Sequence, residues 1–281
     1  SEMCIRDRIQ GVIARHLVRG VPVHDIPLED LLHHAETAAR IGGAFAMEGM
    51  HRRGDVVTRS QHDVKIEMDV ETQERIAEYL RNACPGHHLL GEEGGEHHVK
   101  DGHTWIVEPS DGTMNYFHDI PHWCCSVAIA RDGEVVAGAV YSPTLEEMYT
   151  ATMDGPALRN GEKIRVSDVS DIRDAILVTG GLARLYDQGP ERLDSFFRMA
   201  KRVSKVRILG AAALDLCFVA CGRMDVFYEY QLNIWDTAAA CLIAGRAGAV
   251  VRTFDRESDL IAAYLVSVPA LFDEVAVTLK I

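Results

Sequence analysis

The chain has 281 residues, and 47% of them are hydrophobic, so it can bury a sizeable core as one large domain or two small ones. Its formal net charge of −13 argues against nucleic acid and against an anionic membrane surface as partners, because both carry the same sign of charge. An acidic protein that binds an anionic phosphate needs cations between the two, so the charge is compatible with a metal-dependent enzyme.

The seven cysteines are odd in number and show no C-x-x-C spacing, which is typical of reduced thiols and not of a disulfide framework. No run of 18 apolar residues is present, and no signal peptide is visible. We therefore expect a cytoplasmic protein. Residues 1–26 are expected to be a disordered or artefactual lead, whose first eight residues are typical of translated adapter sequence.

Two helices are predicted in the first part of the chain. Apolar residues at a spacing of three to four predict a helix over residues 27–49, and proline at position 27 suits its first turn. Residues 52–62 are polar and are expected to form a loop. A second amphipathic helix is predicted over residues 69–83, because Pro85 and Gly86 end the pattern.

Residues 105–115 give the most direct indication of a functional site, and they read W-I-V-E-P-S-D-G-T-M-N. The apolar start predicts a buried strand that ends at Glu108 and Pro109, because proline cannot continue a strand ladder. Glu108 and Asp111 then lie three residues apart around a tight turn. Such a segment is either a plain acidic turn of the Asp-Gly type or a pair of carboxylates placed on one cation.

Gly112 and Thr113 follow these acids directly. Gly112 lets the backbone approach a ligand closely, and Thr113 can cap a following helix whose free N–H groups bind phosphate. Two carboxylates at a strand end beside an anion-binding helix start predict a hard-cation site next to a phosphate.

From residue 126 onwards, alternating apolar residues and turn residues predict the strands 126–130, 135–141 and 147–152. The remainder of the chain alternates strands with helices, some of them almost entirely apolar and therefore expected to be buried. The predicted strands are 175–179, 207–209, 226–230, 250–253 and 263–267, and the predicted helices are 191–203, 211–221, 236–247 and 269–279.

Two further acidic segments support the metal site. Residues 90–94 read L-G-E-E-G, and residues 235–239 read W-D-T-A-A. Together with residues 105–115, and in this order, they resemble the inositol monophosphatase family of metal-dependent sugar phosphatases. That family carries G-E-E, then D-P-(L/I)-D-G-T-x-N, then W-D-x-A-A. The resemblance runs from about residue 28 to the C-terminus.

The resemblance implies a mixed α/β fold, a layered α-β-α-β-α sandwich of the sugar-phosphatase type. It also implies two halves. Residues 27–170 are expected to form an N-terminal α+β half with most of the metal ligands. Residues 171–281 are expected to form a C-terminal α/β half that carries Asp236 and the substrate residues.

The family's metal ligands fall on oxygen-bearing residues of this chain. Glu93, Glu108 and the carbonyl of Ser110 are implied for one ion, and Glu108, Asp111 and Asp236 for the second. A third, weaker ion is implied at Glu93. A set of oxygen ligands without Cys or His indicates Mg²⁺ over Zn²⁺, so two to three Mg²⁺ ions are expected.

Catalysis is assigned by the same resemblance to Thr113, which is expected to be hydrogen-bonded to Asp69 and to orient or deprotonate the attacking water. Asp69 stands at the predicted start of a helix, where an acid also simply complements the helix dipole. Both interpretations of Asp69 stay open from the sequence.

Substrate binding is implied for residues on three segments. Backbone N–H groups of Gly112 and Thr113 are expected to bind the phosphate, and Glu229 a polyol hydroxyl, although an exposed acid at a strand end explains Glu229 as well. Ala211 and Ala212 match the family's substrate loop without its threonine hydroxyl. The complete expected set is Asp111, Gly112, Thr113, Ala211, Ala212, Glu229 and Asp236.

We therefore expect a Mg²⁺-dependent phosphomonoesterase that hydrolyses inositol 1-phosphate, or a related polyol or sugar phosphate, with metal-activated water. Its partner would be that small phosphorylated molecule, and the family's tendency implies a homodimer. A histidinol-phosphate or other sugar-phosphate phosphatase of the same family is the alternative substrate assignment.

Glu108 departs from the family, which has Asp there. The extra methylene moves the carboxylate outward by roughly 1.5 Å, whereas Mg²⁺ demands near-ideal geometry. Either the turn retracts or the metal affinity falls. The second outcome would make the protein a catalytically impaired family member that acts as a binding or regulatory dimer.

Overall fold

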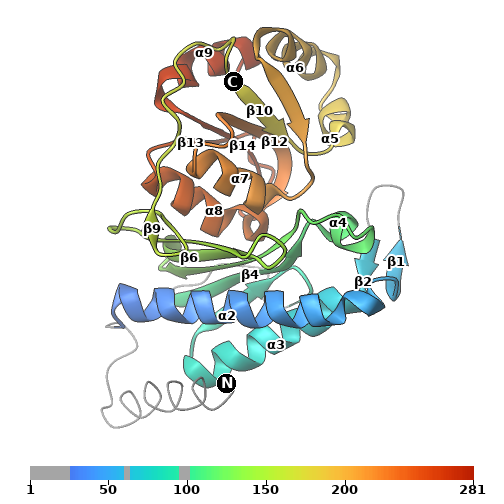
Figure 1. The fold of residues 1–281 in the computed structure, drawn as a ribbon, viewed down its shortest axis with the longest axis vertical. Coiled ribbons are helices and arrows are strands. Elements are labelled where there is room, and N and C mark those ends of the chain that lie inside the picture. Colours follow the sequence, from blue (N-terminus) through green and yellow to red (C-terminus); the bar gives the residue numbers. More distant parts are fainter. Residues whose placement is uncertain (1–25, 60–63, 95–101) are drawn as a thin grey trace.

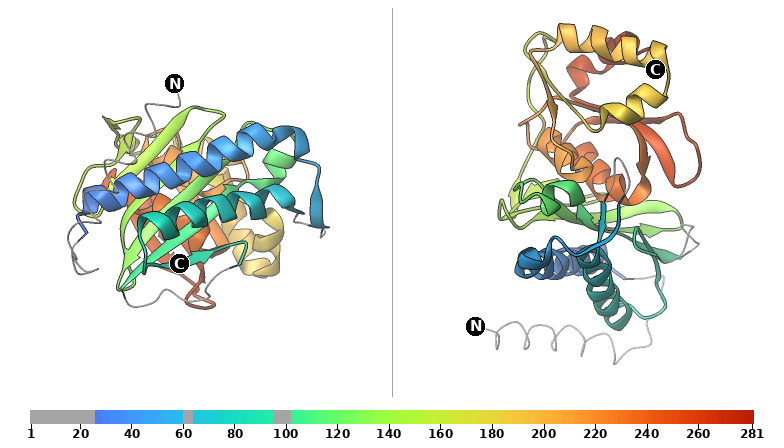
Figure 2. Two further views of the ribbon diagram at one scale, coloured as in Figure 1. Left: turned by 90° about the horizontal axis from the view of Figure 1, so that it is seen from below. Right: turned by 90° about the vertical axis from the view of Figure 1, so that its right-hand side faces the viewer.

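The computed structural model describes residues 26–59, 64–94 and 102–281, which form alternating layers of helix and sheet (Figure 1). The predicted lead lies outside the described residues except for Ile26, and so do residues 60–62 of the predicted loop. Figure 2 (right) shows the layers from the side: helix, sheet, helix, sheet, helix. The layered sandwich expected from the sequence is therefore what the chain forms.

The first layer consists of α2 (Leu28–Glu48) and α3 (Glu67–Ala83), which cover one face of a seven-stranded sheet (Figure 2, left). The apolar stripe of α2 is buried on this sheet, as Leu31 and Ala35 show at 0% exposure. Gly42 lets the helix lie close, because a Cβ there would stand 2.9 Å from Cys125 Sγ. Between the two helices lie η2 (Gly49–Arg52), β1 (Val56–Arg59) and β2 (Val64–Ile66).

The seven-stranded sheet has the order β3-β4-β5-β6-β7-β8-β9 and is antiparallel except for the pair β3 and β4. Its strands are β3 (His88–Gly91), β4 (His103–Asp111), β5 (Cys124–Arg131), β6 (Glu134–Ser142), β7 (Glu147–Thr152), β8 (Leu158–Arg159) and β9 (Glu162–Lys163). The short helix α4 (Thr113–Phe117) follows β4 directly.

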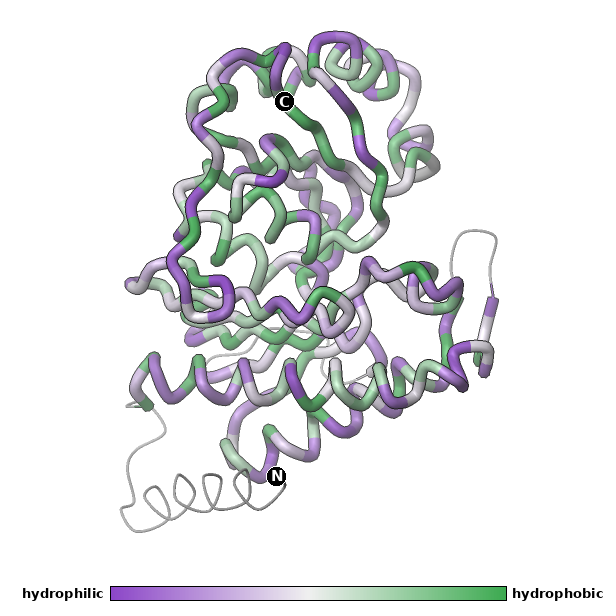
Figure 3. The backbone as a smooth tube through the Cα atoms, viewed as in Figure 1, coloured by the Kyte–Doolittle hydropathy of each residue, from purple (hydrophilic) through white to green (hydrophobic). Residues whose placement is uncertain are grey.

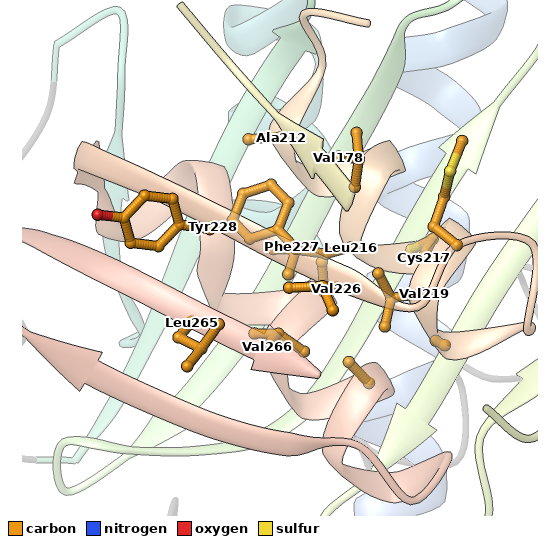
Figure 4. Packing of buried hydrophobic residues seen from close by; sticks show 14 of the residues in the cluster. Val178, Ala212, Leu216, Cys217, Val219, Val226, Phe227, Tyr228, Leu265 and Val266 are labelled. Atoms are coloured by element: carbon orange, nitrogen blue, oxygen red, sulfur yellow. The ribbon is translucent and has the colours of Figure 1, made fainter. Parts of the chain in front are cut away.

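The middle layer consists of α7 (Ala212–Ala220) and α8 (Ile234–Arg246), both buried between the sheets as their apolar sequences predicted. Figure 3 shows these helices and the central strands as the most continuously hydrophobic parts of the chain. Side chains of α7, including Leu216 and Val219, belong to the same core cluster as Val226 and Phe227 of the second sheet (Figure 4).

The second sheet has the order β11-β10-β12-β14-β13, and three helices cover its outer face. Its strands are β10 (Ile176–Thr179), β11 (Lys205–Ile208), β12 (Val226–Asn233), β13 (Val250–Phe254) and β14 (Ile261–Ser267). The outer elements are α5 (Leu182–Asp187), α6 (Pro190–Arg202), η3 (Pro269–Leu271) and α9 (Phe272–Leu279). The division into halves at residue 170 stays a prediction, although α8 of the second half packs on β5, β6 and β7 of the first.

Several boundaries differ from the prediction. β4 continues through Glu108 and Pro109 to Asp111, so the expected strand end at the proline was wrong. β12 likewise extends to Asn233, and α8 begins at Ile234, two residues before Asp236. Among the described residues, no helix combines the length and the apolar content needed to cross a bilayer. The six cysteines of these ranges are all free thiols.

Candidate active site

A cavity of about 510 Å³ opens where the end of β4, α4, the start of α7, the end of β12 and the start of α8 meet. Its acidic lining residues are Glu92, Glu108, Asp111, Glu229 and Asp236. Within the described ranges no Lys, Arg or His side chain contributes to the wall. The cavity therefore concentrates negative charge from both halves of the chain at one point.

A bulge in β4 brings two of these acids to the same side. Along β4 and β5 the register runs from Glu108 opposite Ser126 to Asp111 opposite Cys124, so β4 carries one extra residue in this interval. In a regular strand, residues three apart point to opposite faces. Because of the extra residue, Glu108 and Asp111 point to the same side of the strand, and both line the cavity. Pro109 suits the bulge because it has no N–H to contribute to a ladder.

Asp111 is held by the first turn of α7. Its Oδ1 accepts a hydrogen bond from the N–H of Ala212 at 3.1 Å, and its Oδ2 accepts one from the N–H of Ala213 at 2.7 Å. An acid at this position also complements the positive end of the helix dipole. Ala211 and Ala212, predicted as substrate residues, both line the cavity, and the N–H of Ala212 is bound to Asp111.

Asp236 reaches the cavity from the first turn of α8. Its Oδ2 accepts a hydrogen bond from the N–H of Asn233 at 2.9 Å, while the Asn233 side chain accepts one from the Asp236 N–H. This is a reciprocal capping box, which fixes the acid relative to the helix start. Asn233 also lines the cavity, and the sequence analysis missed it. The spacing N-x-x-D before an apolar helix was the signal that could have identified it.

The two acids of the G-E-E segment take different positions. Glu92 lines the cavity, whereas Glu93 does not: its carboxylate lies 3.0 Å from the Nζ of Lys65, and its side chain is 5% exposed. Adjacent residues beyond a strand end point in different directions, and the letters G-E-E do not show which acid turns inwards. The acids that the structure brings together are therefore Glu92, Glu108, Asp111 and Asp236.

Burial, together with repulsion from neighbouring acids, raises the pKa of Glu92, Glu108 and Asp111. Burial, with added repulsion from Asp236 and Glu93, raises the pKa of Glu92 to about 7. Burial and repulsion from Asp236 likewise raise the pKa of Asp111 to about 7. The pKa of Glu108 lies well above its ordinary value for the same reasons, burial being the largest. Buried acids that repel one another are neutralised by protons or by bound cations.

The donor set fits Mg²⁺, because the cavity offers carboxylate oxygens and no thiolate or imidazole ligand from the described residues. In these same ranges, no three His, Cys, Asp or Glu side chains are already close enough to enclose a metal ion. Asp111 directs both of its oxygens, and Asp236 one, to backbone N–H groups, and Glu108 Oε1 accepts a hydrogen bond from the Ser110 N–H at 3.1 Å.

Thr113 lines the cavity, but its expected bond to Asp69 was wrong. The Thr113 Oγ1 donates to the carbonyl of Ser110 at 3.1 Å, which is the same carbonyl that was predicted as a metal ligand. Asp69 lies buried in the first turn of α3, and its Oδ1 has no hydrogen-bond partner among the described residues. Asp69 therefore lies at a helix start, where an acid complements the helix dipole. The contact with Thr113 is not observed.

Gly112, and not Thr113, is the N-cap of α4. Gly112 has φ of 94°, which favours glycine, and a Cβ there would lie 3.1 Å from both Ala211 Cβ and the carbonyl oxygen of His122. Thr113 is the first residue of the helix, which is only five residues long. The turn therefore brings its backbone close to the loop before α7.

Glu229 belongs to the cavity wall and is not an exposed strand-end acid. It is 7% exposed and stands where β12 departs from regular pairing with β14, between Glu229 and Leu232. The carboxylate lies so close to Gly180 that a Cβ on this glycine would be 1.8 Å from Glu229 Oε1. The Glu229 carboxylate is thus part of the cavity wall, next to Gly180.

Asn115 is a second residue that the sequence analysis left without a role. Its Nδ2 donates hydrogen bonds to the carbonyls of His122 and Leu209, each at 2.7 Å. It thereby ties α4 to the loop that leads into α7. The asparagine is the last letter of the D-G-T-x-N segment, which was the available signal.

Comparison with known proteins identifies the family to which this chain belongs. Residues 27–279 match the model of the inositol monophosphatase family. An inositol-1-monophosphatase of Caulobacter vibrioides is 39% identical over 194 residues, which cover 68% of this chain and 75% of that protein. Nus factor SuhB of Xylella fastidiosa is 34% identical over 201 residues, covering 71% of this chain and 72% of that protein.

The solved structure of Thermotoga maritima IMPase has a TM-score of 0.79 to this chain at 31% sequence identity, and the match covers 89% of this chain and 97% of the other. The resemblance seen in the three acidic segments and the layered fold that it implied are both confirmed.

Proposed function

Because the chain belongs to the inositol monophosphatase family, a family of phosphoric monoester hydrolases, we propose that it hydrolyses the phosphate ester of inositol or of a related polyol or sugar with the help of Mg²⁺. The predicted enzyme class is confirmed by this membership. One observation carries the proposal: four carboxylates from separate segments, Glu92, Glu108, Asp111 and Asp236, line the same cavity.

These four carboxylates would hold the ions, together with the carbonyl of Ser110. Fully ionised, they carry the charge that two divalent cations balance. Mg²⁺ bound there would supply a nucleophilic water at neutral pH and neutralise charge on the phosphoryl and leaving oxygens. Ser110 lies in the bulge between Glu108 and Asp111, so its carbonyl is placed between two of the acids.

Thr113 is assigned to the attacking water, because it is the hydroxyl side chain of α4 that lines the cavity. Its Oγ1 needs only to rotate away from the Ser110 carbonyl to accept or orient a water molecule. The backbone N–H groups of Gly112 and Thr113 are assigned to the phosphate. Asp69 does not line the cavity; it lies buried in the first turn of α3, and we assign it no contact with the ions or the phosphate.

We assign the part of the cavity around Glu229 to binding the leaving group. Glu229 would accept a hydrogen bond from a polyol hydroxyl, and Asn233 lines the same wall. An ammonium group would suit Glu229 equally well, so histidinol phosphate remains the alternative substrate. Comparing kcat/KM for inositol 1-phosphate, sugar phosphates and histidinol phosphate distinguishes the two. We also keep a cytoplasmic location, a homodimer and the absence of nucleic-acid partners as predictions.

A catalytically impaired, regulatory protein is the second candidate, and Glu108 is the observation that favours it. The structure supports the enzyme, because the Glu108 side chain bends towards the Ser110 N–H and still lines the cavity with the other acids. Glu108→Asp separates the candidates. We expect the wild type to turn over and the variant to gain less than about fivefold in kcat/KM. An inactive wild type with an active variant would identify a pseudo-enzyme.

The proposed reaction is tested by phosphate release from inositol 1-phosphate. Release should require Mg²⁺ and stop in EDTA, and both Thr113→Ala and Asp236→Asn should lower kcat by at least about a hundredfold. Asp273→Asn, on the exposed face of α9, serves as the control and should retain wild-type activity. Release that is independent of Mg²⁺, or unchanged in both variants, would refute the proposal.

A further inference from the structure

The side chain of Gln73 on α3 holds the turn that carries Glu92. Its Oε1 accepts a hydrogen bond from the N–H of Glu93 at 2.9 Å, and its Nε2 donates one to the carbonyl of Gly94 at 3.0 Å. Gln73 itself is buried, with 7% of its surface exposed. Both ends of the amide are therefore directed at residues that follow Glu92.

The contact between Gln73 and this turn is also close. A Cβ on Gly91 would stand 2.4 Å from Gln73 Oε1, so the strand end approaches the amide to a distance that only glycine permits. On its other side, the N–H of Glu92 donates to the carbonyl of Val107 on β4 at 3.3 Å. The backbone at Glu92 is thus fixed by β4 on one side and by α3 on the other.

Lys65 determines where the second acid of the pair goes. Its Nζ lies 3.0 Å from Glu93 Oε2, and this ion pair keeps the Glu93 carboxylate outside the cavity wall. The two neighbouring acids therefore take different positions. Glu93 pairs with a lysine of β2, and Glu92 lines the cavity. The hydrogen bonds of Gln73 act on the peptide groups immediately beyond Glu92 and favour this arrangement.

We propose that Gln73 is a positioning residue that fixes Glu92 in the cavity and so sets the affinity for Mg²⁺. This inference rests on the proposed function, in which Glu92 is a ligand. Gln73 itself touches neither the ion nor the substrate, since it does not line the cavity. Partners that orient metal ligands in this way typically contribute 10- to 100-fold to metal affinity.

A double-mutant cycle on Mg²⁺ binding tests the proposal. The Mg²⁺ dissociation constant is measured by calorimetry, and independently from the rise of the unfolding temperature with Mg²⁺ concentration. The proteins are the wild type, Gln73→Met, Glu92→Gln and the double variant. Gln73→Met and Glu92→Gln should each weaken binding by roughly tenfold or more. The double variant should bind within about threefold of Glu92→Gln alone, because both changes remove the same interaction.

Additive losses, or an unchanged affinity in Gln73→Met, would overturn the inference. An unchanged affinity in Glu92→Gln would instead refute Glu92 as a ligand and with it the proposed metal site. Gln188→Met, at the end of α5, is the matched control and should bind Mg²⁺ like the wild type. Should Gln73→Met fail to fold, Gln73→Asn keeps the amide but shortens its reach. It should lose affinity, and wild-type affinity there would overturn the inference.

Discussion

His122 Nε2 lies 2.9 Å from Asp215 Oδ1 and joins the loop before β5 to α7. Asp215 is completely buried, and its second oxygen has no hydrogen-bond partner among the described residues. The backbone carbonyl of His122 also accepts the amide of Asn115. The pair therefore docks α7 against α4, and α7 is the helix whose first N–H groups hold Asp111.

Removing one member of this pair should destabilise the protein. Asp215→Ala leaves His122 without its partner in a buried place, and we expect the free energy of unfolding to fall by about 2–3 kcal/mol. Asp215→Asn retains a hydrogen-bonding group of the same shape and should lose less than about 1 kcal/mol. Urea unfolding in EDTA measures both. Equal stabilities for Asp215→Ala and the wild type would show that the contact contributes nothing.

The acid cluster should make the metal-free protein less stable at high pH. Glu92 has its pKa raised from 4.5 to about 7, and Asp111 from 3.8 to about 7. At pH values between the ordinary and the raised pKa, the folded state binds more protons than the unfolded state. The free energy of unfolding therefore falls as the pH rises through this interval. In EDTA we therefore expect lower stability at pH 8 than at pH 5.5, and Mg²⁺ should restore it at pH 8.

Urea unfolding at both pH values, with and without Mg²⁺, checks this dependence. Glu92→Gln provides the control, because it removes one titrating group and should flatten the pH profile. A wild type that is equally stable at both pH values in EDTA would contradict the repulsion assigned to the cluster.

Gly180 should determine whether Glu229 can occupy its place in the cavity. A Cβ at residue 180 would collide with the Glu229 carboxylate at 1.8 Å, so Gly180→Ala should displace it. Losing one hydrogen bond to the leaving group corresponds to a rise in KM of about tenfold. Mg²⁺ affinity should change little, because Glu229 is not one of the proposed ligands.

Gly181→Ala is the matched control for this experiment, since a Cβ there meets nothing within 4 Å among the described residues. Steady-state kinetics with inositol 1-phosphate should give wild-type KM for Gly181→Ala and a raised KM for Gly180→Ala. Equal KM values in the two variants would exclude a role for Glu229 in binding the leaving group.

The sequence predicted the buried helices and the acidic segments because those features depend on local patterns, whereas the layered arrangement was implied by the family resemblance. The apolar spacing of α2 and the nearly continuous apolar runs of α7 and α8 determine where these helices can be buried. Acids next to glycine or at a helix start similarly marked Asp111 and Asp236. These are properties of short segments and need no knowledge of the fold.

The remaining features depend on contacts between distant segments. Only the pairing of β4 with β5 reveals the bulge that places Glu108 beside Asp111. The choice between Glu92 and Glu93 depends on Lys65 and Gln73, which lie 19 or more residues earlier in the chain. The bond expected between Thr113 and Asp69 failed for the same reason, because the Ser110 carbonyl competes for the Thr113 hydroxyl.

The central claim is that the Mg²⁺-dependent site is built from acids that share one cavity, with Glu92 and not its neighbour among them. The most direct measurement is kcat/KM for inositol 1-phosphate in saturating Mg²⁺ for Glu92→Gln and Glu93→Gln, two identical changes at adjacent positions. We expect Glu92→Gln to lose at least about a hundredfold and Glu93→Gln to stay within about tenfold of the wild type. Wild-type activity in Glu92→Gln, or a greater loss in Glu93→Gln, would contradict this site.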